Sequence, residues 1–171
     1  AWTIFGRINP VAFGAVFALS SSIGPIVGQN LGAQEFGRVR EAITAAIKAT
    51  IGFTMLAWLL LFLSAPLIVS AFGVTDEAKA LVYYYCRWLP PLFAFLGALF
   101  VANAIFNTLR HPHYATMFNW GRATIGTIPF VWLGGHLSGA AGVITGSLSG
   151  AVVFGLVAVW MCYRVVDKLE N

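Results

Sequence analysis

The chain has 171 residues, of which 59% are hydrophobic and 9% are charged, and its net charge is +4. A typical soluble domain is about 25% charged, so ten basic and six acidic side chains are too few to cover a water-soluble globule of this size. The basic residues are scattered singly instead of forming a patch, which argues against a nucleic-acid partner. The composition favours a protein whose surface faces the lipid bilayer.

Hydrophobic stretches divide the chain into membrane-spanning segments. A spanning helix needs about 20 mostly apolar residues, and the last uncharged stretch, 123–163, is long enough for nearly two crossings, with a glycine-rich turn at 134–139. We predict an all-α membrane protein, a bundle of about five transmembrane helices. The predicted spans are 10–33, 44–72, 80–107, 114–133 and 140–163.

The first predicted span contains glycines at four-residue spacing. Gly24, Gly28 and Gly32 share one helix face, where small residues let a neighbouring backbone approach closely. We therefore predict a helix-packing motif, and a sliding surface for conformational change would use the same physics. Gln29 and Asn30 are polar residues near the end of this span.

The third predicted span combines prolines with amides. Pro90 and Pro91 each remove a backbone donor and tend to bend a helix. Asn103 and Asn107 lie one turn apart, on one face of the same span. Bends of this kind are typical of transporters, and they also occur in passive bundles.

Spans four and five supply the remaining candidates. Asn119 and Arg122 come early in span four, and span five repeats the small-residue pattern as a second packing motif at Gly142, Gly146 and Gly150. If the polar residues of spans one, three and four converge, they line a water-filled crevice for a substrate. Alternatively, they form hydrogen bonds between helices.

Basic residues predict the orientation, because loops rich in Lys and Arg stay in the cytoplasm. Seven fall on one side of the predicted bundle: Arg38, Arg40, Lys48, Arg110, Arg122, Arg164 and Lys168. Three fall on the other: Arg7, Lys79 and Arg87. We expect an integral protein of a bacterial inner (plasma) membrane with a cytoplasmic C-terminus. The run of Tyr83, Tyr84 and Tyr85 is expected at the outer interface, which aromatic rings prefer.

No acidic residue falls at membrane depth, since all six lie in predicted loops or at helix ends: Glu35, Glu41, Asp76, Glu77, Asp167 and Glu170. Ion coupling usually requires an ionisable group in the membrane, so we expect the coupling ion to bind outside this chain. The two cysteines, Cys86 and Cys162, fit no metal spacing, and we expect neither a metal nor an organic cofactor. Ser20, Ser21 and Ser22 have no His or acid at their depth, so we expect no enzyme.

Two motifs resemble those of the multidrug and toxin extrusion (MATE) family of secondary transporters. The first is the V-G-Q-N-x-G-A run of residues 27–33, followed by Arg38-Val39-Arg40. The second is Asn103-Ala104-Ile105-Phe106-Asn107-Thr108-Leu109-Arg110-His111-Pro112, and a further match is the glycine pattern of Gly139, Gly142 and Gly146. The resemblance covers nearly the whole chain.

The resemblance implies one half of a two-lobed, twelve-helix transporter. The chain would be the C-terminal lobe, residues 1–171, working with an N-terminal lobe that this sequence does not include. The implied function is cation-coupled antiport, with H⁺ or Na⁺ driving the export of small amphipathic, often cationic, drugs or metabolites. The alternative is a flippase for lipid-linked saccharides. Some family members carry an Asp where this chain has Gly97, Ala98 and Leu99, which places the coupling carboxylate in the other lobe.

Overall fold

The computed structural model describes residues 2–73 and 76–171, and the side chains of Trp2, Asp76 and Glu77 lie outside that description. Within these ranges the chain is helical and contains no strand. The helices are α1 (Trp2–Gly32), α2 (Phe36–Ala71), α3 (Asp76–Trp88), the 3-10 helix η1 (Pro90–Leu92), α4 (Phe93–Thr108), α5 (Pro112–Ala123) and α6 (Ile128–Glu170). The predicted placement of the Asp76 and Glu77 side chains falls outside the described part.

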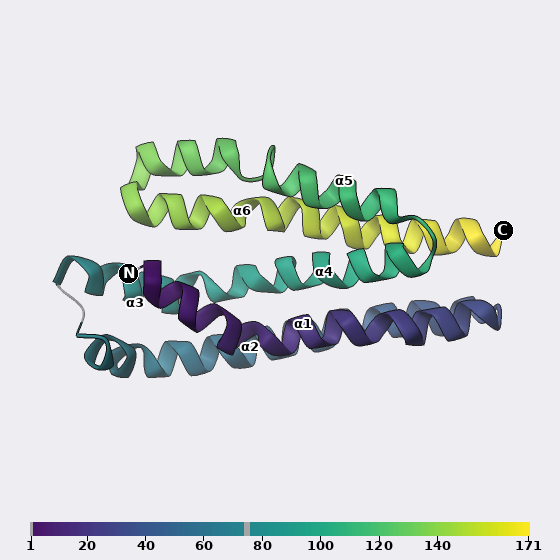
Figure 1. Ribbon diagram of the computed structural model, residues 1–171, viewed down its shortest axis with the longest axis horizontal. Helices are drawn as coiled ribbons and strands as arrows, with labels where there is room; N and C mark the ends of the chain where they lie inside the picture. Colours follow the sequence, from purple (N-terminus) through teal and green to yellow (C-terminus); the bar gives the residue numbers. More distant parts are fainter. Residues whose placement is uncertain (1, 74–75) are drawn as a thin grey trace.

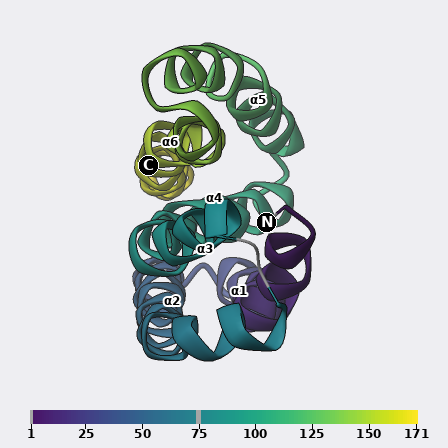
Figure 2. The ribbon, with the colours of Figure 1, turned by 90° about the vertical axis from the view of Figure 1, so that its left-hand side faces the viewer.

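The helices form three layers, with α4 in the middle (Figures 1 and 2). On one side α4 packs against α1 and α2, and on the other side against α5 and α6. Four segments are apolar and long enough to cross a membrane: Thr3–Gly32, Phe36–Ala71, Pro90–Thr108 and Pro112–Glu170. The last of these is a hairpin of two crossings. The predicted class, an all-α bundle of about five transmembrane helices, is confirmed.

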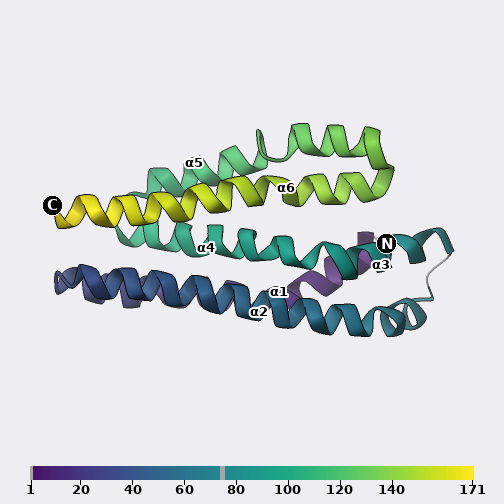
Figure 3. The same ribbon diagram turned by 180° about the vertical axis from the view of Figure 1, so that it is seen from behind.

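The hairpin turns within α6, at Ser138 and Gly139. Gly139 has φ 56° and ψ −134°, a backbone conformation that side chains disfavour. The chain reverses there and runs back alongside itself (Figure 3). The turn falls inside the glycine-rich segment 134–139, where the sequence predicts it.

Several helices extend beyond the predicted spans. The first starts at Trp2 instead of residue 10, the second at Phe36 instead of 44, and the last ends at Glu170 instead of 163. Charges mark where the hydrocarbon ends, but a helix can continue into the headgroup region and water. The helices are therefore longer than the spans that the sequence predicts.

Two predicted spans are interrupted. The third divides into α3, η1 and α4, because Pro90 and Pro91 lack the N–H groups that would continue the helix. Leu89 and Pro90 are buried, and irregular backbone at membrane depth is tolerated where protein covers it. The fourth divides between α5 and α6. In a continuous helix the ring of Pro129 would clash with the carbonyl four residues earlier, and the helix is interrupted at that point.

Glycines set the spacing of the α6 hairpin. A Cβ added to Gly142 would overlap the carbonyl of Gly134, one added to Gly146 would overlap that of Phe130, and one added to Gly150 would overlap that of Gly126. The two helical arms of the hairpin thus meet backbone to backbone. In α1 the approach is looser, because a Cβ added to Gly24 or Gly28 would lie 3.2 or 3.4 Å from the side chain of Thr108. A Cβ added to Gly32 would meet no described atom of another element within 4 Å, so close packing does not require a glycine there.

One end of the bundle is held by polar contacts between α2 and α6. The Arg40 guanidinium bonds Asp167 at 2.7 Å and also contacts Glu170. One turn further along α2, the hydroxyls of Thr44 and Tyr163 are 2.8 Å apart. We call this end, which carries the 33–35 and 109–111 connections and the C-terminus, the basic end.

We expect Gly142→Ala to destabilise the hairpin, because the new methyl group overlaps the Gly134 backbone, which cannot rotate away. Overpacking of this kind costs about 1–3 kcal/mol. Gly52→Ala in α2 is the matched control: it makes the same chemical change at an exposed helix position, where the added Cβ would meet no described atom of another element within 4 Å. Since Ala favours a helix over Gly by about 0.5–1 kcal/mol, the control should be neutral or slightly stabilising. Thermal unfolding in detergent measures both variants, and equal melting temperatures would contradict the backbone contact.

Candidate functional site

The strongest candidate site lies on the face of α4 between α1 and α5. Helix α4 contacts both neighbours, but α1 and α5 make no contact with each other among the residues that the structure describes. Viewed from the end, α1 and α5 diverge on one side of α4 (Figure 2). We call this strip of α4 the open face.

Phe100, Asn103 and Asn107 follow one another along the open face at the three- and four-residue spacing of a helix. The ring of Phe100 lies 5.2 Å from that of Phe17 on α1. Asn107 is exposed, whereas Asn103 is 9% exposed and its Oδ1 is buried. The strip is therefore polar towards the basic end and aromatic further along.

Helix α5 presents its polar residues beside the contact with α4. Phe118 stacks on Phe106 of α4, with ring centroids 5.7 Å apart and planes at 8°. Gly121 faces Phe154 of α6, so Arg122, one residue on, turns away from α6 towards the open face. The Nε atom of Arg122 is buried and has no hydrogen-bond partner among the described residues.

Asn103 and Arg122 lie at the same level on neighbouring helices. Helices α4 and α5 run in opposite directions (Figure 1), and the Phe106–Phe118 stack marks a point of contact between them. Asn103 precedes Phe106 by three residues and Arg122 follows Phe118 by four, so each lies about one turn further from the basic end. No hydrogen bond joins them within the described ranges, and both the Asn103 oxygen and the Arg122 nitrogen are unsatisfied.

The other predicted polar residues do not join this pair. The amide of Asn119 donates to the Ala115 carbonyl at 2.9 Å, and that of Asn30 donates to the Ile26 carbonyl at 2.8 Å, each within its own helix. Gln29 is exposed in the last turn of α1, and Asn107 lies in the last turn of α4. The structure thus separates Asn103 and Arg122 from a looser polar set at the basic end.

A second polar cluster lies at the other end of the bundle and was not predicted. Tyr85 is 2% exposed and donates its hydroxyl to the Asn9 side chain, which corrects the expectation of an interfacial ring. Successive side chains of a helix point 100° apart, so Tyr83, Tyr84 and Tyr85 cannot all face the membrane interface. A cavity of about 140 Å³ adjoins this bond, lined by these two residues together with Phe5, Gly6, Phe93, Ile144, Ser147 and Leu148. The sequence feature that could have indicated this cluster is Asn9, a polar residue in an apolar segment, directly before Pro10.

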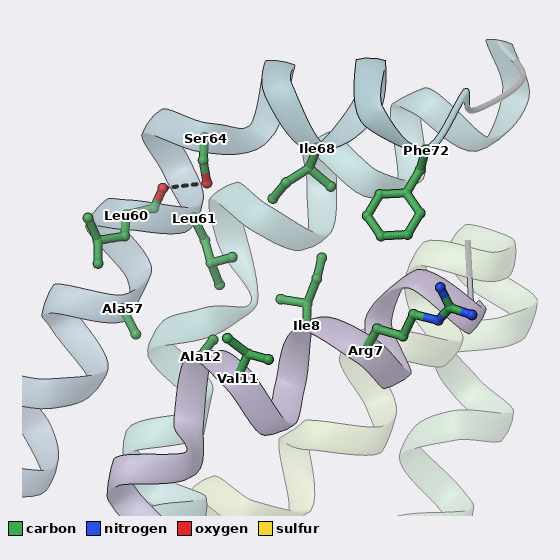
Figure 4. A pocket seen from close by; sticks show the side chains of 10 residues that line it. All are labelled: Arg7, Ile8, Val11, Ala12, Ala57, Leu60, Leu61, Ser64, Ile68 and Phe72. Atoms are coloured by element: carbon green, nitrogen blue, oxygen red, sulfur yellow. Dashed lines mark hydrogen bonds between the residues drawn. The ribbon is translucent and has the colours of Figure 1, made fainter.

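A larger cavity of about 410 Å³ opens between α1 and α2 (Figure 4). Its lining is apolar apart from Arg7 and Ser64, and the Ser64 hydroxyl donates a hydrogen bond to the Leu60 carbonyl at 2.7 Å. Leu60 and Val11 are among its exposed side chains. We call this cavity the apolar wedge, and it suits hydrocarbon better than a polar solute.

Acidic and metal-ligating groups do not gather at depth. Among the described residues no three His, Cys, Asp or Glu side chains are placed to hold a metal ion. The acids whose side chains are described are Glu35, Glu41, Asp167 and Glu170, and they lie at the basic end, in the first turns of α2 and the last turns of α6. Cys86 and Cys162 are buried and unpaired.

Comparison with known proteins agrees with this architecture. Residues 1–133 match the MatE family model. A protein of Pseudomonas savastanoi, described as a 21 kDa protein in the iaaL 5′ region, is 34% identical over 88% of this chain and 49% of its own length. An FAD transporter of Shewanella oneidensis is 24% identical over 96% of this chain and 36% of its own.

Among solved structures, the bent form of the Vibrio cholerae MATE transporter VcmN superposes with a TM-score of 0.88 and is 26% identical. The match covers 99% of this chain and 39% of VcmN. The chain therefore spans between about a third and a half of the length of these relatives. By its family-model match and its fold, the chain belongs to the MatE family, that of the multidrug and toxin extrusion transporters.

Proposed function

We propose that the protein carrying this chain is a secondary active transporter that exports small amphipathic drugs or metabolites in exchange for H⁺ or Na⁺. The observation that carries the proposal is the unsatisfied Asn103–Arg122 pair on the open face of a MatE bundle. Buried polar atoms without partners are rare in proteins, and at membrane depth they are typical of a substrate or ion pathway.

The coupling ion would bind in a part of the protein outside this chain. The four acids whose side chains are described lie at the basic end, so none of them is available to bind H⁺ or Na⁺ in mid-membrane. Alternating access in such transporters relies on two repeats that rock about a central site. We infer that the open face turns towards a second, N-terminal lobe, and that this lobe supplies the coupling carboxylate.

The substrates would combine an apolar or aromatic body with a polar group. Phe100 and Phe17 provide aromatic surface beside the Asn103–Arg122 pair. The relative named as an FAD transporter suggests that metabolites belong to the range of substrates, besides the cationic drugs that the family resemblance implies.

We expect inside-out vesicles that contain the whole protein to accumulate a test drug such as ethidium when a Na⁺ or pH gradient is imposed. An ionophore that dissipates the gradient should abolish the uptake. Residues 1–171 alone should give none, because one lobe cannot alternate access. Gradient-independent uptake, or uptake by residues 1–171 alone, would contradict the proposal.

The alternative, a flippase for lipid-linked saccharides, draws support from the apolar wedge. That cavity faces lipid between α1 and α2 and carries one cation, Arg7, among its lining residues. A lipid chain could occupy it while the headgroup crosses along the open face. Co-purification of a lipid-linked saccharide with the whole protein would favour this function over drug export.

We further propose that the basic end faces the cytoplasm of a bacterial cell and that the Ser138 turn faces outwards. Both cysteines of this chain are buried, at 0% and 1% exposure, so within residues 1–171 a new surface cysteine can be labelled selectively. A membrane-impermeant maleimide on intact cells should label Ser138→Cys at once, and Ala33→Cys only after permeabilisation. Both positions are exposed in the structure, and the reverse labelling pattern would overturn the orientation.

A further inference from the structure

We propose that Arg122 and Asn103 form a recognition site for the negatively charged group, a carboxylate or phosphate, of the transported molecule. The inference rests on the proposed function and narrows it, because it assigns a charge to a part of the substrate. It also places the contact at one level of the bundle, on α4 and α5.

Arg122 carries its charge deep in the bundle. It follows Pro112, the first residue of α5, by ten residues, which at 1.5 Å per residue places it about 15 Å along the helix. That distance is about half of the roughly 30 Å thickness of a hydrocarbon core. A cation at this depth is costly unless it is paired or lines an aqueous path.

No acid in the described part of the chain can pair with Arg122. Asp167 and Glu170 contact Arg40, and Glu35 and Glu41 lie at the start of α2. These four side chains are all at the basic end. The charge of Arg122 is therefore uncompensated by them, and an incoming anion would supply the missing partner.

The two unsatisfied atoms on these helices have complementary hydrogen-bonding needs. Arg122 Nε can only donate a hydrogen bond, and Asn103 Oδ1 can only accept one. Both are buried and without a partner, although they lie at the same level. A phosphate monoanion fits both needs at once, because its oxygens accept from Arg122 while its remaining hydroxyl donates to Asn103.

The break between α5 and α6 adds to the positive electrostatic potential around Arg122. The first half of α6 starts at Ile128, six residues after Arg122, and the N-terminus of a helix carries partial positive charge. Discontinuous membrane helices commonly direct such ends at anionic substrate groups. The Thr127 hydroxyl donates to the Arg122 carbonyl at 2.8 Å, which links the break to the turn of α5 that carries the arginine.

Flavin mononucleotide and riboflavin provide a matched pair of probes, because they share one aromatic ring system and differ by a phosphate. Fluorescence titration of the purified whole protein measures both affinities without requiring transport, and ethidium serves as the cationic probe. We expect the wild type to bind flavin mononucleotide at least about tenfold more tightly than riboflavin, as a charge-assisted bond to Arg should provide.

Arg122→Gln should remove this preference, so that flavin mononucleotide and riboflavin bind with equal affinity. Asn103→Asp is the sharper variant, because it is nearly isosteric and places an internal carboxylate opposite Arg122. It should also abolish the preference for the phosphate. Arg38→Gln, which makes the same change at an exposed arginine near the start of α2, should retain it.

Other outcomes would overturn the site. Equal binding of both flavins by the wild type would do so, as would a preference that survives Arg122→Gln. If Arg122→Gln weakens all three probes and lowers the melting temperature alike, Arg122 is paired with a structural water or with an acid from another part of the protein. Failure of ion-driven transport with the flavin preference intact would refute the proposed function and leave the anion site standing.

Discussion

The bundle depends on α4 being packed on both sides at distances that glycine permits. A Cβ on Gly97 of α4 would overlap Thr50 of α2 and Val16 of α1, and one on Gly155 of α6 would overlap the Phe95 carbonyl of α4. Without a hydrophobic force between helices in lipid, close van der Waals contact is the main source of association. The two outer layers are thus joined through α4, and any change in its position alters both.

The position of α4 also explains where the polar residues are found. Because α1 and α5 attach to different sides of α4 and do not touch each other in the described part of the chain, a strip of α4 between them stays open, and Asn103 lies along it. A polar pair buried between two helices would ordinarily be satisfied by those helices. Here it is not, which is why the pair serves better as a binding surface than as a packing element.

The irregular parts of the backbone follow from proline and from protein cover. The breaks at η1 and between α5 and α6 occur at or just before prolines, in a bilayer that offers no water to the released backbone groups. Leu89 and Pro90 are buried, and at the second break the Thr127 hydroxyl donates to the Arg122 carbonyl. These interruptions divide two crossings into half-helices, and they give the bundle hinge points that an unbroken helix would lack.

The sequence by itself determined the number of crossings, a turn within 134–139, and the family, because hydrophobic length, glycine spacing and local motifs are properties of short segments. It also identified Asn103 and Arg122, since a polar residue in an apolar span is conspicuous. Only the tertiary structure decided which polar residues meet: Asn30 and Asn119 bond to their own helices, whereas Asn103 and Arg122 remain unsatisfied. The buried Asn9–Tyr85 bond likewise joins residues 76 positions apart. Such pairings depend on helix rotation and level, which no single segment encodes.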